Sequence, residues 1–504
     1  MSAQDRDRGR DQRRSGGPRG PRRSDDGPRG ARRSGDGGGE RKRSGRVSQA
    51  RLVAYDVLRD VDDRDAYANL ALPARIREAG LDERDAALAT ELAAGSLRLR
   101  GRYDRIIELA SGRSIEQVDG RTRNVLRLGV HQLLGMRTAD HAAVNESVEL
   151  QRLVANQNAA GFVNGVLRAV GRATNEEWDA RIAEEARNAD EALAARTSHP
   201  AWVLRALRDA LKLEGRGAEL EELLESDNRP PRVSLAVLLG AGVDAETAAE
   251  ARALELAGPS PIGLELAGGD PARAIDACGA RKGFVRVQDQ GSQLAALALT
   301  RVRPAAAGER WLDLCAGPGG KSAVLGAEAL AAGATVRANE VSDHRADLVR
   351  RSIEPVAEAV EVVSHDGRDD AAYGPGSFDR ILVDAPCSGL GALRRRPEAR
   401  WRKEPGDLPG LTGLQRELLE AAVDHLAPGG VLAYVTCSPH LAETRVAVDG
   451  LLKRHPELTE LDAKQAVQEV ARGPLDLPGD ALSAQLWPHR HGTDAMFISL
   501  ITKA

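Results

Sequence analysis

Two of the four cysteines occupy equivalent places in the sequence. Cys387 follows the apolar run 378–383 and the tripeptide Asp-Ala-Pro, and Cys437 follows the apolar run 431–435. A serine comes directly after each of them. A lone cysteine is usually a small buried side chain, but the carboxyl ends of parallel strands meet at one edge of a sheet, where ligands bind. Their parallel placement therefore predicts two thiols at one active edge.

A glycine-rich turn stands at another predicted strand end. Residues 311–322 read WLDLCAGPGGKS, which is an apolar strand, a glycine-rich turn and the start of a helix. It is not a good P-loop, since Cys315 stands where that motif has its first glycine, and a nucleoside without a phosphate chain fits it better. Glu340 ends the next predicted strand, where an acid can bind ribose hydroxyls. Asp366 follows the third strand, where it can meet the adenine edge.

Two thiols beside a nucleoside cofactor suit methyl transfer to carbon 5 of cytosine. That carbon is a poor nucleophile until a thiolate adds at carbon 6, after which it can attack a methyl sulfonium. A free thiol has a pKa of about 8.5, so the site must favour the thiolate. Asp384 stands where it could hydrogen-bond N3 of the base and ease the addition. A second thiol would help the elimination that releases the product, but spacing alone does not say which cysteine attacks.

The elements that must position these residues alternate between strand and helix from Arg310 onward. Strand–helix alternation with short connections implies a doubly wound, mainly parallel sheet. The pattern predicts strands at 310–314, 335–340, 360–364, 378–383 and 431–435, and helices at 321–332, 343–353 and 414–426.

The first half of the chain has a helical pattern instead. A further helical stretch from about 178 to 224 is broken at His199-Pro200, and short β-like runs at 232–238 and 283–288 follow the sequence Asn-Arg-Pro-Pro. Ala, Leu, Ile and Val recur at three- and four-residue spacing in 50–61, 83–99, 121–136, 143–154 and 160–170.

Composition limits the class of protein. Apolar residues make up 42% of the 504 residues, which is enough for two or three domains with their own cores. The sequence has no long apolar run that could span a membrane and no secretory signal. The four cysteines form no CxxC pair and have no histidine at metal spacing, which argues against a disulfide framework and a zinc site. We expect a reduced, cytoplasmic protein without a metal ion.

The charge is unevenly distributed along the chain. Residues 1–46 hold 15 Lys and Arg against 7 Asp and Glu, and the remainder holds 56 against 68. The basic segment has almost no apolar side chains, so we expect it to be a disordered arm. It would either bind RNA loosely through charge and arginine stacking or act as a solubilising tail.

Several motifs resemble those of the RNA cytosine-5 methyltransferases. In the catalytic half these are DLCAGPGGKS (313–322), DAPCSGLG (384–391), RRRPEARW (394–401) and YVTCS (434–438). Within that family the chain is similar to the RsmB (Sun) group, which uses S-adenosylmethionine to methylate a cytosine of 16S ribosomal RNA and carries an N-terminal NusB-like RNA-binding domain. The segments that extend the similarity are HAAVNESVEL (141–150), FVNGVLR (162–168), SHPAWVL (198–204) and VQDQGSQLAA (287–296).

The resemblance implies a multidomain fold, in which an all-α NusB-like bundle precedes an α/β Rossmann-like methyltransferase domain. We expect five parts. These are the arm at 1–46, the NusB-like helical domain at 47–175, a helical linker at 176–230, a small α+β RNA-binding subdomain at 231–300 and the catalytic domain at 301–504.

The resemblance also implies roles for the site residues. It makes Cys437 the nucleophile and Cys387 the group that aids product release. Two departures from the family pattern are Glu340, where Asp is commoner, and SPHLAET (438–444), where a Glu-Asn ending is frequent. The implied cofactor contacts are Cys315, Ala316, Gly317, Pro318, Gly319, Gly320, Lys321, Glu340, Asp366 and Asp384. Lys321 could alternatively shape the base pocket or cap the loop.

A basic run follows the Cys387 loop directly. We expect its cations to contact RNA phosphates at the mouth of the site, although such a run is often only a solvated face. Trp401 could stack on a base or pack inside the protein. A patch on the helical domain, formed by Arg121, Arg123, Arg127 and Arg168, is slightly better read as ordinary surface charge. The basic residues of the run are Arg394, Arg395, Arg396, Arg400, Arg402 and Lys403.

The predicted substrate is a cytosine in a single strand or loop of 16S ribosomal RNA, because the base must leave any stack to react. We expect a monomer. One alternative is a tRNA cytosine-5 methyltransferase with the same catalytic residues, against which the helical domain argues. The other is a non-catalytic RNA-binding factor, which would predict a degraded cofactor loop, acids or cysteines, and all of these are present.

Overall fold

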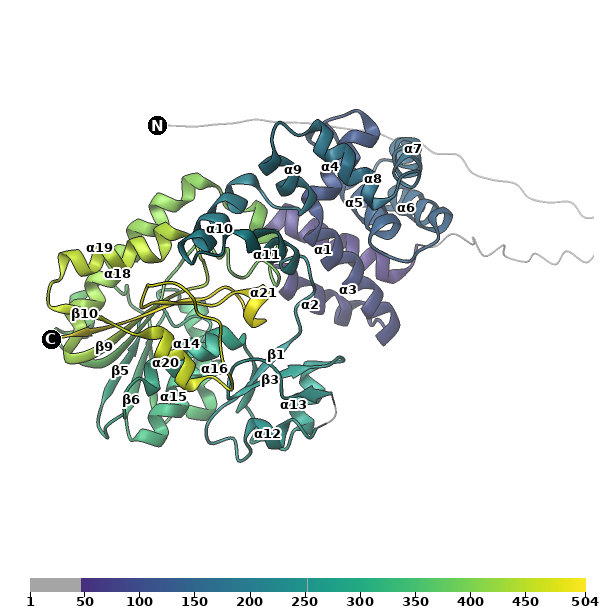
Figure 1. The fold of residues 1–504 in the computed structure, drawn as a ribbon. Coiled ribbons are helices and arrows are strands. Elements are labelled where there is room, and N and C mark those ends of the chain that lie inside the picture. The colour runs from purple at the N-terminus through teal and green to yellow at the C-terminus, as the bar shows by residue number, and fades with distance from the viewer. Residues whose placement is uncertain (1–46, 252) are drawn as a thin grey trace, which may run out of the picture. The chain divides into compact units, whose positions relative to one another are not determined.

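The computed structural model describes residues 47–251 and 253–504, so the arm predicted at 1–46 lies outside the described residues. The first half is a helical bundle, as predicted (Figure 1). The apolar side chains of its first helix, from Ala50 to Val61, are buried in one continuous core with those of the other helices. The bundle consists of α1 (Gln49–Arg64), α2 (Ala68–Ala79), α3 (Glu83–Arg98), α4 (Arg100–Ser111), α5 (Gly120–Leu134), α6 (Asp140–Val154) and α7 (Ala160–Val170).

Two helices of the bundle have no counterpart in the sequence prediction. Helix α2 contains Pro73 and buries only Ala68 and Leu72, so its apolar period is weak. Helix α4 begins with the polar stretch Arg-Gly-Arg and buries its apolar side chains only later. The spacing of apolar residues therefore does not predict a helix that is stabilised mainly by tertiary contacts.

Four more helices lead from the bundle to a small antiparallel sheet. They are α8 (Asn175–Glu185), α9 (Ala189–Arg196), α10 (Ala201–Leu213) and α11 (Leu220–Ser226), and the predicted break at His199-Pro200 lies between α9 and α10. Pro200 is the N-cap residue of α10. The sheet has the order β2-β3-β1-β4 and contains β1 (Ser234–Val237), β2 (Leu254–Glu255), β3 (Gly263–Leu266) and β4 (Val285–Val287), with α12 (Ala245–Ala248) and α13 (Pro271–Ala277) beside it.

The catalytic half contains the predicted, mainly parallel sheet, which confirms the fold class. The sheet has the order β10-β12-β9-β8-β5-β6-β7, and the pairs from β9 to β7 are parallel. Its strands are β5 (Arg310–Asp313), β6 (Thr335–Asn339), β7 (Val360–Val363), β8 (Phe378–Asp384), β9 (Leu426–Thr436), β10 (Leu458–Leu461) and β12 (Phe497–Lys503), and β11 (Ala484–Gln485) pairs with β12. Its helices are α14 (Gln290–Arg301), α15 (Gly320–Ala332), α16 (Asp343–Ile353), α17 (Asp370–Tyr373), α18 (Leu408–His425), α19 (Arg445–Arg454), α20 (Ala463–Val470) and α21 (Pro488–His491).

Alternating side chains of each strand pack into two separate cores. On β5, Trp311 joins the core with α14, α15, α16 and α20, whereas Leu312 joins the core with α18 and α19. On β9, Ala433 and Tyr434 divide in the same way. Successive side chains of a strand point to opposite faces, so both faces of the sheet are covered by helices (Figure 1). This two-sided burial leaves the strand ends as the place where polar groups can gather.

The C-terminal antiparallel strands β10 and β12 have no counterpart in the prediction. Strand β12 reads FISLITK, and its first five residues are all buried. A strand that is buried on both faces shows no alternation of apolar and polar residues, and short apolar runs cannot be told from helix by period alone.

Two general findings concern the described part of the chain. None of its helices is both long and apolar enough to cross a membrane. Between residues 47 and 504, leaving out 252, no cluster of three or more His, Cys, Asp or Glu side chains has the arrangement of a metal site.

Candidate functional site

The two predicted thiols meet at the carboxyl ends of neighbouring strands. Strands β8 and β9 run parallel, with Asp384 opposite Val435 in the register. Each strand ends just before its cysteine, so the Sγ atoms of Cys387 and Cys437 lie 3.4 Å apart. Both cysteines are half-buried. The structure thus brings together two nucleophilic groups that are 50 residues apart in the chain.

The two thiols differ in their affinity for a proton. A hydrogen bond from the Cys387 thiol lowers the pKa of Cys437, and the Lys321 ammonium acts in the same direction, whereas burial and the carboxylates of Asp384 and Asp494 oppose the shift. The pKa of Cys387 is raised well above its usual value by its hydrogen bond to Cys437, by burial and by the negative charge of Cys437. The thiolate, not the thiol, is the nucleophile, so the arrangement favours Cys437 as the attacking group.

An ion pair lies beside the thiols. The Nζ atom of Lys321, in the first turn of α15, donates a hydrogen bond of 2.8 Å to Oδ2 of Asp384. Burial opposes the charge on Lys321, but Asp384 and Cys437 outweigh it and raise the pKa of Lys321. Among the roles left open for Lys321, the structure therefore favours one in which its fixed cation orients Asp384 next to the thiols.

A buried network behind the cysteines was missed by sequence reasoning. Ser388 and Ser438, the residues that follow the two cysteines, lie with their Oγ atoms 3.0 Å apart. Both hydroxyls donate to the carboxylate of Glu443, which ends the short 3₁₀ helix η7 (Leu441–Glu443). The sequence feature that could have pointed to Glu443 is that it is the one acidic residue in the stretch PHLAET. In the sequence this stretch stands out only as a departure from the family pattern.

The glycine-rich loop between β5 and α15 lies against Glu340. A Cβ atom on Gly317 would lie only 2.0 Å from Oε2 of Glu340, so the loop backbone passes directly over this carboxylate. Gly319 has a φ of +98°, and a Cβ atom there would lie 2.5 Å from Ser352. Glu340 is nearly buried and lies 3.3 Å from Arg345. The loop and the strand-end acid thus form one cradle of the kind that a nucleoside needs.

Asp313, at the end of β5, adds a second acid beneath the same loop. Its Oδ2 atom accepts a hydrogen bond of 2.7 Å from Ser322, and the backbone amide of Cys315 also interacts with its carboxylate. Burial raises the pKa of Asp313 to about 7.

Asp366 follows β7 at the same edge, but its carboxylate is occupied within the protein. Both of its oxygens accept hydrogen bonds from Arg368, which also contacts Glu417. The hydrogen bonds from Arg368 lower the pKa of Asp366 to about 2. Asp366 is nevertheless exposed, and a carboxylate can accept further hydrogen bonds, so the contact with an adenine edge stays a prediction.

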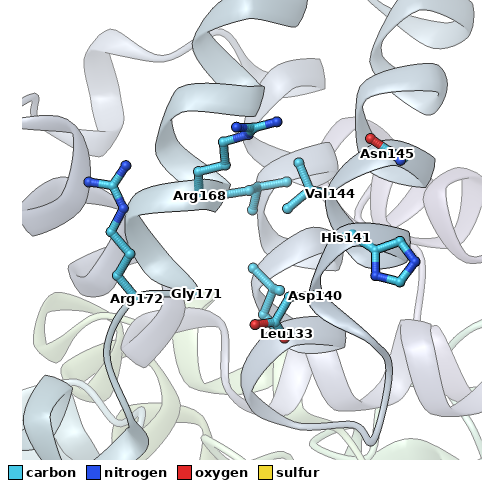
Figure 2. Close-up of a pocket in the computed structure, with 9 residues that line it drawn as sticks. Leu133, Asp140, His141, Val144, Asn145, Arg168, Gly171 and Arg172 are labelled. Carbon is cyan, nitrogen blue, oxygen red and sulfur yellow. The ribbon is translucent and has the colours of Figure 1, made fainter.

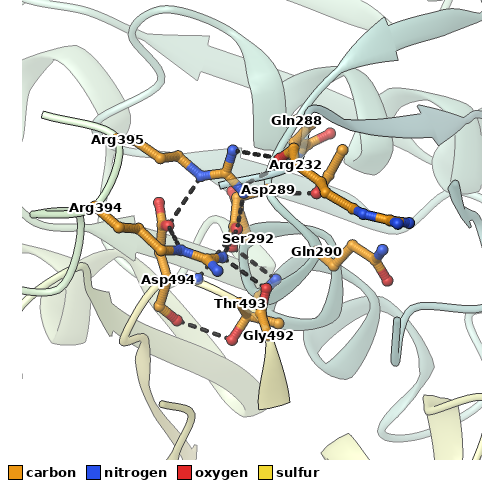
Figure 3. A network of polar contacts seen from close by, with 12 residues as sticks. Arg232, Gln288, Asp289, Gln290, Ser292, Arg394, Arg395, Gly492, Thr493 and Asp494 are labelled. Carbon is orange, nitrogen blue, oxygen red and sulfur yellow. Dashed lines mark hydrogen bonds and ion pairs between the residues drawn. The ribbon is translucent and has the colours of Figure 1, made fainter. Parts of the chain in front are cut away.

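The basic run after the Cys387 loop is largely used inside the protein, which corrects part of the prediction. Arg394 and Arg395 form ion pairs of 2.8 to 3.4 Å with Asp289 and Asp494 (Figure 3). The backbone also links this segment to the Cys437 loop, because the amide of Gly391 donates to the carbonyl of Cys437. The guanidinium groups of Arg394 and Arg395 therefore brace the site, and the structure assigns them this role in place of the predicted contact with phosphates.

Arg400 and Trp401 are likewise directed inward, toward the helical half of the chain. Arg400 is fully buried and donates hydrogen bonds to carbonyl oxygens of Arg98, Ser198 and Asp227 and to the side chain of Asn228. The ring of Trp401 lies so close to Gly101 that a Cβ atom there would be only 2.4 Å from it. For Arg400 a phosphate contact is thus ruled out by burial, and Trp401 packs.

The remaining members of the run are more accessible. Arg402 is half-buried and donates to the carbonyl of Ala66, and Lys403 is half-buried. Arg396 is exposed, and both Arg396 and Arg402 place their guanidinium groups 5.1 Å from the ring centre of Tyr67. Arg396, Arg402 and Lys403 stay as predicted RNA contacts.

We expect Arg400→Ala to destabilise the protein more than any change at an exposed arginine of this run. The substitution leaves four buried hydrogen-bond acceptors without their donor, which should cost about 3 kcal/mol or more. Calorimetric unfolding of the whole chain should show a clearly lower midpoint. Arg396→Ala is the matched control and should stay near the wild-type midpoint, since surface changes rarely exceed about 0.5 kcal/mol. Equal midpoints for the two variants would contradict the assignment.

The helical domain has a hollow of about 450 Å³ between α6 and α7 (Figure 2). Arg168, His141 and Asn145 line it. Arg127 cannot belong to an RNA-facing patch, because it is buried and paired with Asp104 at 2.7 Å. Arg121 is exposed and Arg123 is half-buried, which leaves the proposed patch as scattered surface charge.

Comparison with known proteins matches both halves of the chain. The family model described as 16S rRNA methyltransferase RsmB/F matches residues 301–502, and that of the NusB family matches residues 48–172. Rv1407 of Mycobacterium tuberculosis, whose name calls it a methyltransferase without a substrate, is 46% identical over 90% of this chain and 96% of its own length. Ribosomal RNA small subunit methyltransferase B of Erwinia tasmaniensis is 30% identical over 91% and 99%, and that of Pseudomonas putida is 33% identical over 82% and 91%.

A solved structure, that of PH0851, shares the fold with a TM-score of 0.73 and 22% identity, covering 90% of this chain and 98% of that one. The alignments with the relatives from Mycobacterium tuberculosis and Erwinia tasmaniensis span 96% and 99% of the relatives' own length, at identities of 46% and 30%. We conclude that the chain belongs to the RsmB/F family of 16S rRNA methyltransferases and is an S-adenosylmethionine-dependent RNA methyltransferase.

Proposed function

We propose that this chain methylates carbon 5 of a cytosine in 16S ribosomal RNA through a covalent bond between Cys437 and carbon 6. The observation that carries the proposal is the 3.4 Å contact between the Cys387 and Cys437 thiols beside the Lys321–Asp384 ion pair. Relatives named small subunit methyltransferase B support the choice of 16S RNA as the substrate.

The proposed reaction divides the work among three side chains. The Cys437 thiolate adds at carbon 6, and the displaced electron pair moves toward N3, which takes up a proton. Asp384, fixed by Lys321 through Oδ2, would carry that proton on its other oxygen, donate it to N3 during the addition and take it back during the elimination. S-adenosylmethionine, when bound, supplies an electrophilic methyl group. After methyl transfer Cys387 releases its own proton to water, and its thiolate then removes the proton from carbon 5. The electron pair of that C–H bond restores the double bond between carbons 5 and 6 and expels the Cys437 thiolate from carbon 6. The methylated base leaves, and both sulfurs are ready for another turnover.

The cofactor contacts are also a proposal, and the residues present fit a nucleoside. Glu340 would accept the ribose hydroxyls, because its carboxylate lies directly under the backbone at Gly317. The buried carboxyl group of Asp313 lies at the end of β5, where the same loop begins, and is held there by Ser322. The loop from Cys315 to Lys321 would enclose the ligand, with Asp366 and Asp384 at the two flanking strand ends.

We expect Gly317→Ala to weaken binding of S-adenosylmethionine by about tenfold to a hundredfold. The added methyl group would displace the Glu340 carboxylate, and a hydrogen bond to a charged group contributes about 1.5–3 kcal/mol. Calorimetric titration of the protein with the cofactor measures this directly. Gly410→Ala is the control, because Gly410 lies in α18 with open space around its Cα atom. If Gly317→Ala binds S-adenosylmethionine with wild-type affinity, this loop is not part of the cofactor site.

Mapping of 5-methylcytosine in RNA from cells with and without the gene tests the substrate. The proposal predicts that one cytosine of 16S RNA loses its methyl group while tRNA marks persist. Loss of a tRNA mark with intact ribosomal RNA would favour the tRNA alternative. Methylation of the same position by purified protein and in vitro RNA would show that the effect is direct.

A further inference from the structure

Glu443 connects the two cysteine loops through hydrogen bonds to the residues that follow the cysteines. It is completely buried. Its Oε1 atom accepts hydrogen bonds from the backbone amide of Ser388 at 2.7 Å and from Gln415 at 3.3 Å. Its Oε2 atom accepts from the hydroxyls of Ser388 and Ser438. One carboxylate thus binds the residue that follows each thiol, and any shift of it would change the distance between the thiols.

The donors to Glu443 are neutral groups, so its negative charge is not cancelled by them. A buried carboxylate is usually paired with a cation, because moving a charge out of water is costly. Here a backbone amide, two hydroxyls and one side-chain amide satisfy the oxygens. An uncompensated charge acts strongly on its neighbours, since the interior screens it less than water does.

The charged groups around the thiol pair are arranged unevenly. Glu443, from η7, acts on Cys387 and favours its protonated form, as does the deprotonated Cys437 beside it. Lys321, from α15, acts on Cys437 and favours its thiolate, against the carboxylates at the end of β8 and in the loop before β12, which are Asp384 and Asp494. The buried Tyr434 hydroxyl on β9 donates to the backbone carbonyl of Glu443. Glu443 is thus the carboxylate that acts on Cys387, whereas Lys321 and two other carboxylates act on Cys437 in opposite directions.

We propose that Glu443 is a positioning residue that ties the two cysteine loops together and, by its uncompensated charge, keeps the shared proton on Cys387 so that Cys437 is the thiolate. This inference rests on the proposed function for its use in catalysis. The predicted protonation of the two thiols concerns the protein without RNA or cofactor. The single proton of the pair remains on Cys387 as an S–H donor to the Cys437 sulfur, 3.4 Å away.

Alkylation by iodoacetamide without RNA or cofactor tests the proposal. Both cysteine residues are partly exposed, so the small reagent iodoacetamide is chosen. Mass spectrometry of each cysteine peptide between pH 6 and pH 10 gives separate rate profiles. In the wild-type protein we expect Cys437 to be alkylated at lower pH than Cys387. Glu443→Gln should raise the rate at Cys387 about tenfold near neutral pH, which corresponds to a shift of about one pKa unit. Because no substrate is present, failure of the proposed methylation would leave this result unaffected.

Two control variants separate the effect of the Glu443 charge from the effect of its hydrogen bonds to the cysteine loops. Ser388→Ala removes one hydroxyl donor but leaves the charge, so it should not raise the rate at Cys387, and Glu469→Gln removes an exposed carboxylate on α20 and should change neither profile. An unchanged Cys387 profile in folded Glu443→Gln would overturn the proposal. If that variant does not fold, the wild-type profile decides, since alkylation of Cys387 at lower pH than Cys437 would equally overturn it.

Discussion

Cys437→Ala should lower the rate of RNA methylation by roughly four orders of magnitude or more, which is the scale seen when a covalent nucleophile is removed. Carbon 5 of cytosine cannot attack a methyl group unless a nucleophile first adds at carbon 6, and the neighbouring thiol cannot replace Cys437 in this role. Cys387 binds its proton more tightly, and it sits next to the buried charge of Glu443. Transfer of a radioactive methyl group from S-adenosylmethionine to RNA measures the loss.

Cys278→Ala is the matched control for this variant. Cys278 is buried at the end of α13, in the small antiparallel subdomain, and its thiol donates to the carbonyl of Ile275. Its removal should leave the methylation rate near that of the wild type. Binding of S-adenosylmethionine should be unchanged in Cys437→Ala, because the cofactor loop is intact. A methylation rate of Cys437→Ala close to that of the wild type would contradict the covalent mechanism, whereas lost cofactor binding would indicate a folding defect instead.

The place of the thiols could be predicted from local pattern, because it depends only on where strands end. Apolar runs before Cys387 and Cys437 define two strands, and parallel neighbours bring their carboxyl ends to one edge. The same reasoning located Glu340 at the end of β6. What the pattern could not supply was the order of attack, for which the positions of Lys321 and Glu443 give a physical reason in the folded chain.

The basic run shows why other parts could not be predicted. Six cations in ten residues suggest a solvated or RNA-facing surface, yet Arg400 is fully buried among carbonyl oxygens of segments up to 302 residues away. Its partners are backbone groups, which leave no trace in the sequence. Arg394 and Arg395 meet Asp289 and Asp494, which lie about a hundred residues away on either side. Long-range polar contacts of this kind depend on the complete fold.

Glu443 was overlooked for a related reason. Its four donors come from three segments, and only Ser438 is near it in the chain. A single acid in a neutral stretch is ordinarily a surface residue, since glutamate is rarely buried. Its burial, and hence its effect on the thiols, becomes evident only when β8 and β9 lie side by side.

Cys387→Ala should instead trap a covalent complex between the protein and its RNA. In the proposed reaction Cys437 still adds to carbon 6 and the methyl group still reaches carbon 5. The Cys387 sulfur lies 3.4 Å from the Cys437 sulfur and is the proposed acceptor of the C5 proton. Without it the proton leaves slowly, and the bond between enzyme and base is therefore broken slowly. The adduct should resist denaturant and migrate as a slower band on a denaturing gel. Its RNA should carry one methyl group per bound protein, and turnover should stop after the first round.

Two further variants determine whether such a band reports this mechanism. The double variant Cys387→Ala with Cys437→Ala should give no adduct, because the attacking sulfur is gone. Cys387→Ala in the background of Gly317→Ala should accumulate the adduct more slowly and should regain speed at high S-adenosylmethionine, since only cofactor binding is impaired. An adduct in the double variant would show that neither cysteine forms the bond to the base. Complete absence of an adduct in Cys387→Ala with active cofactor binding would exclude Cys387 from product release.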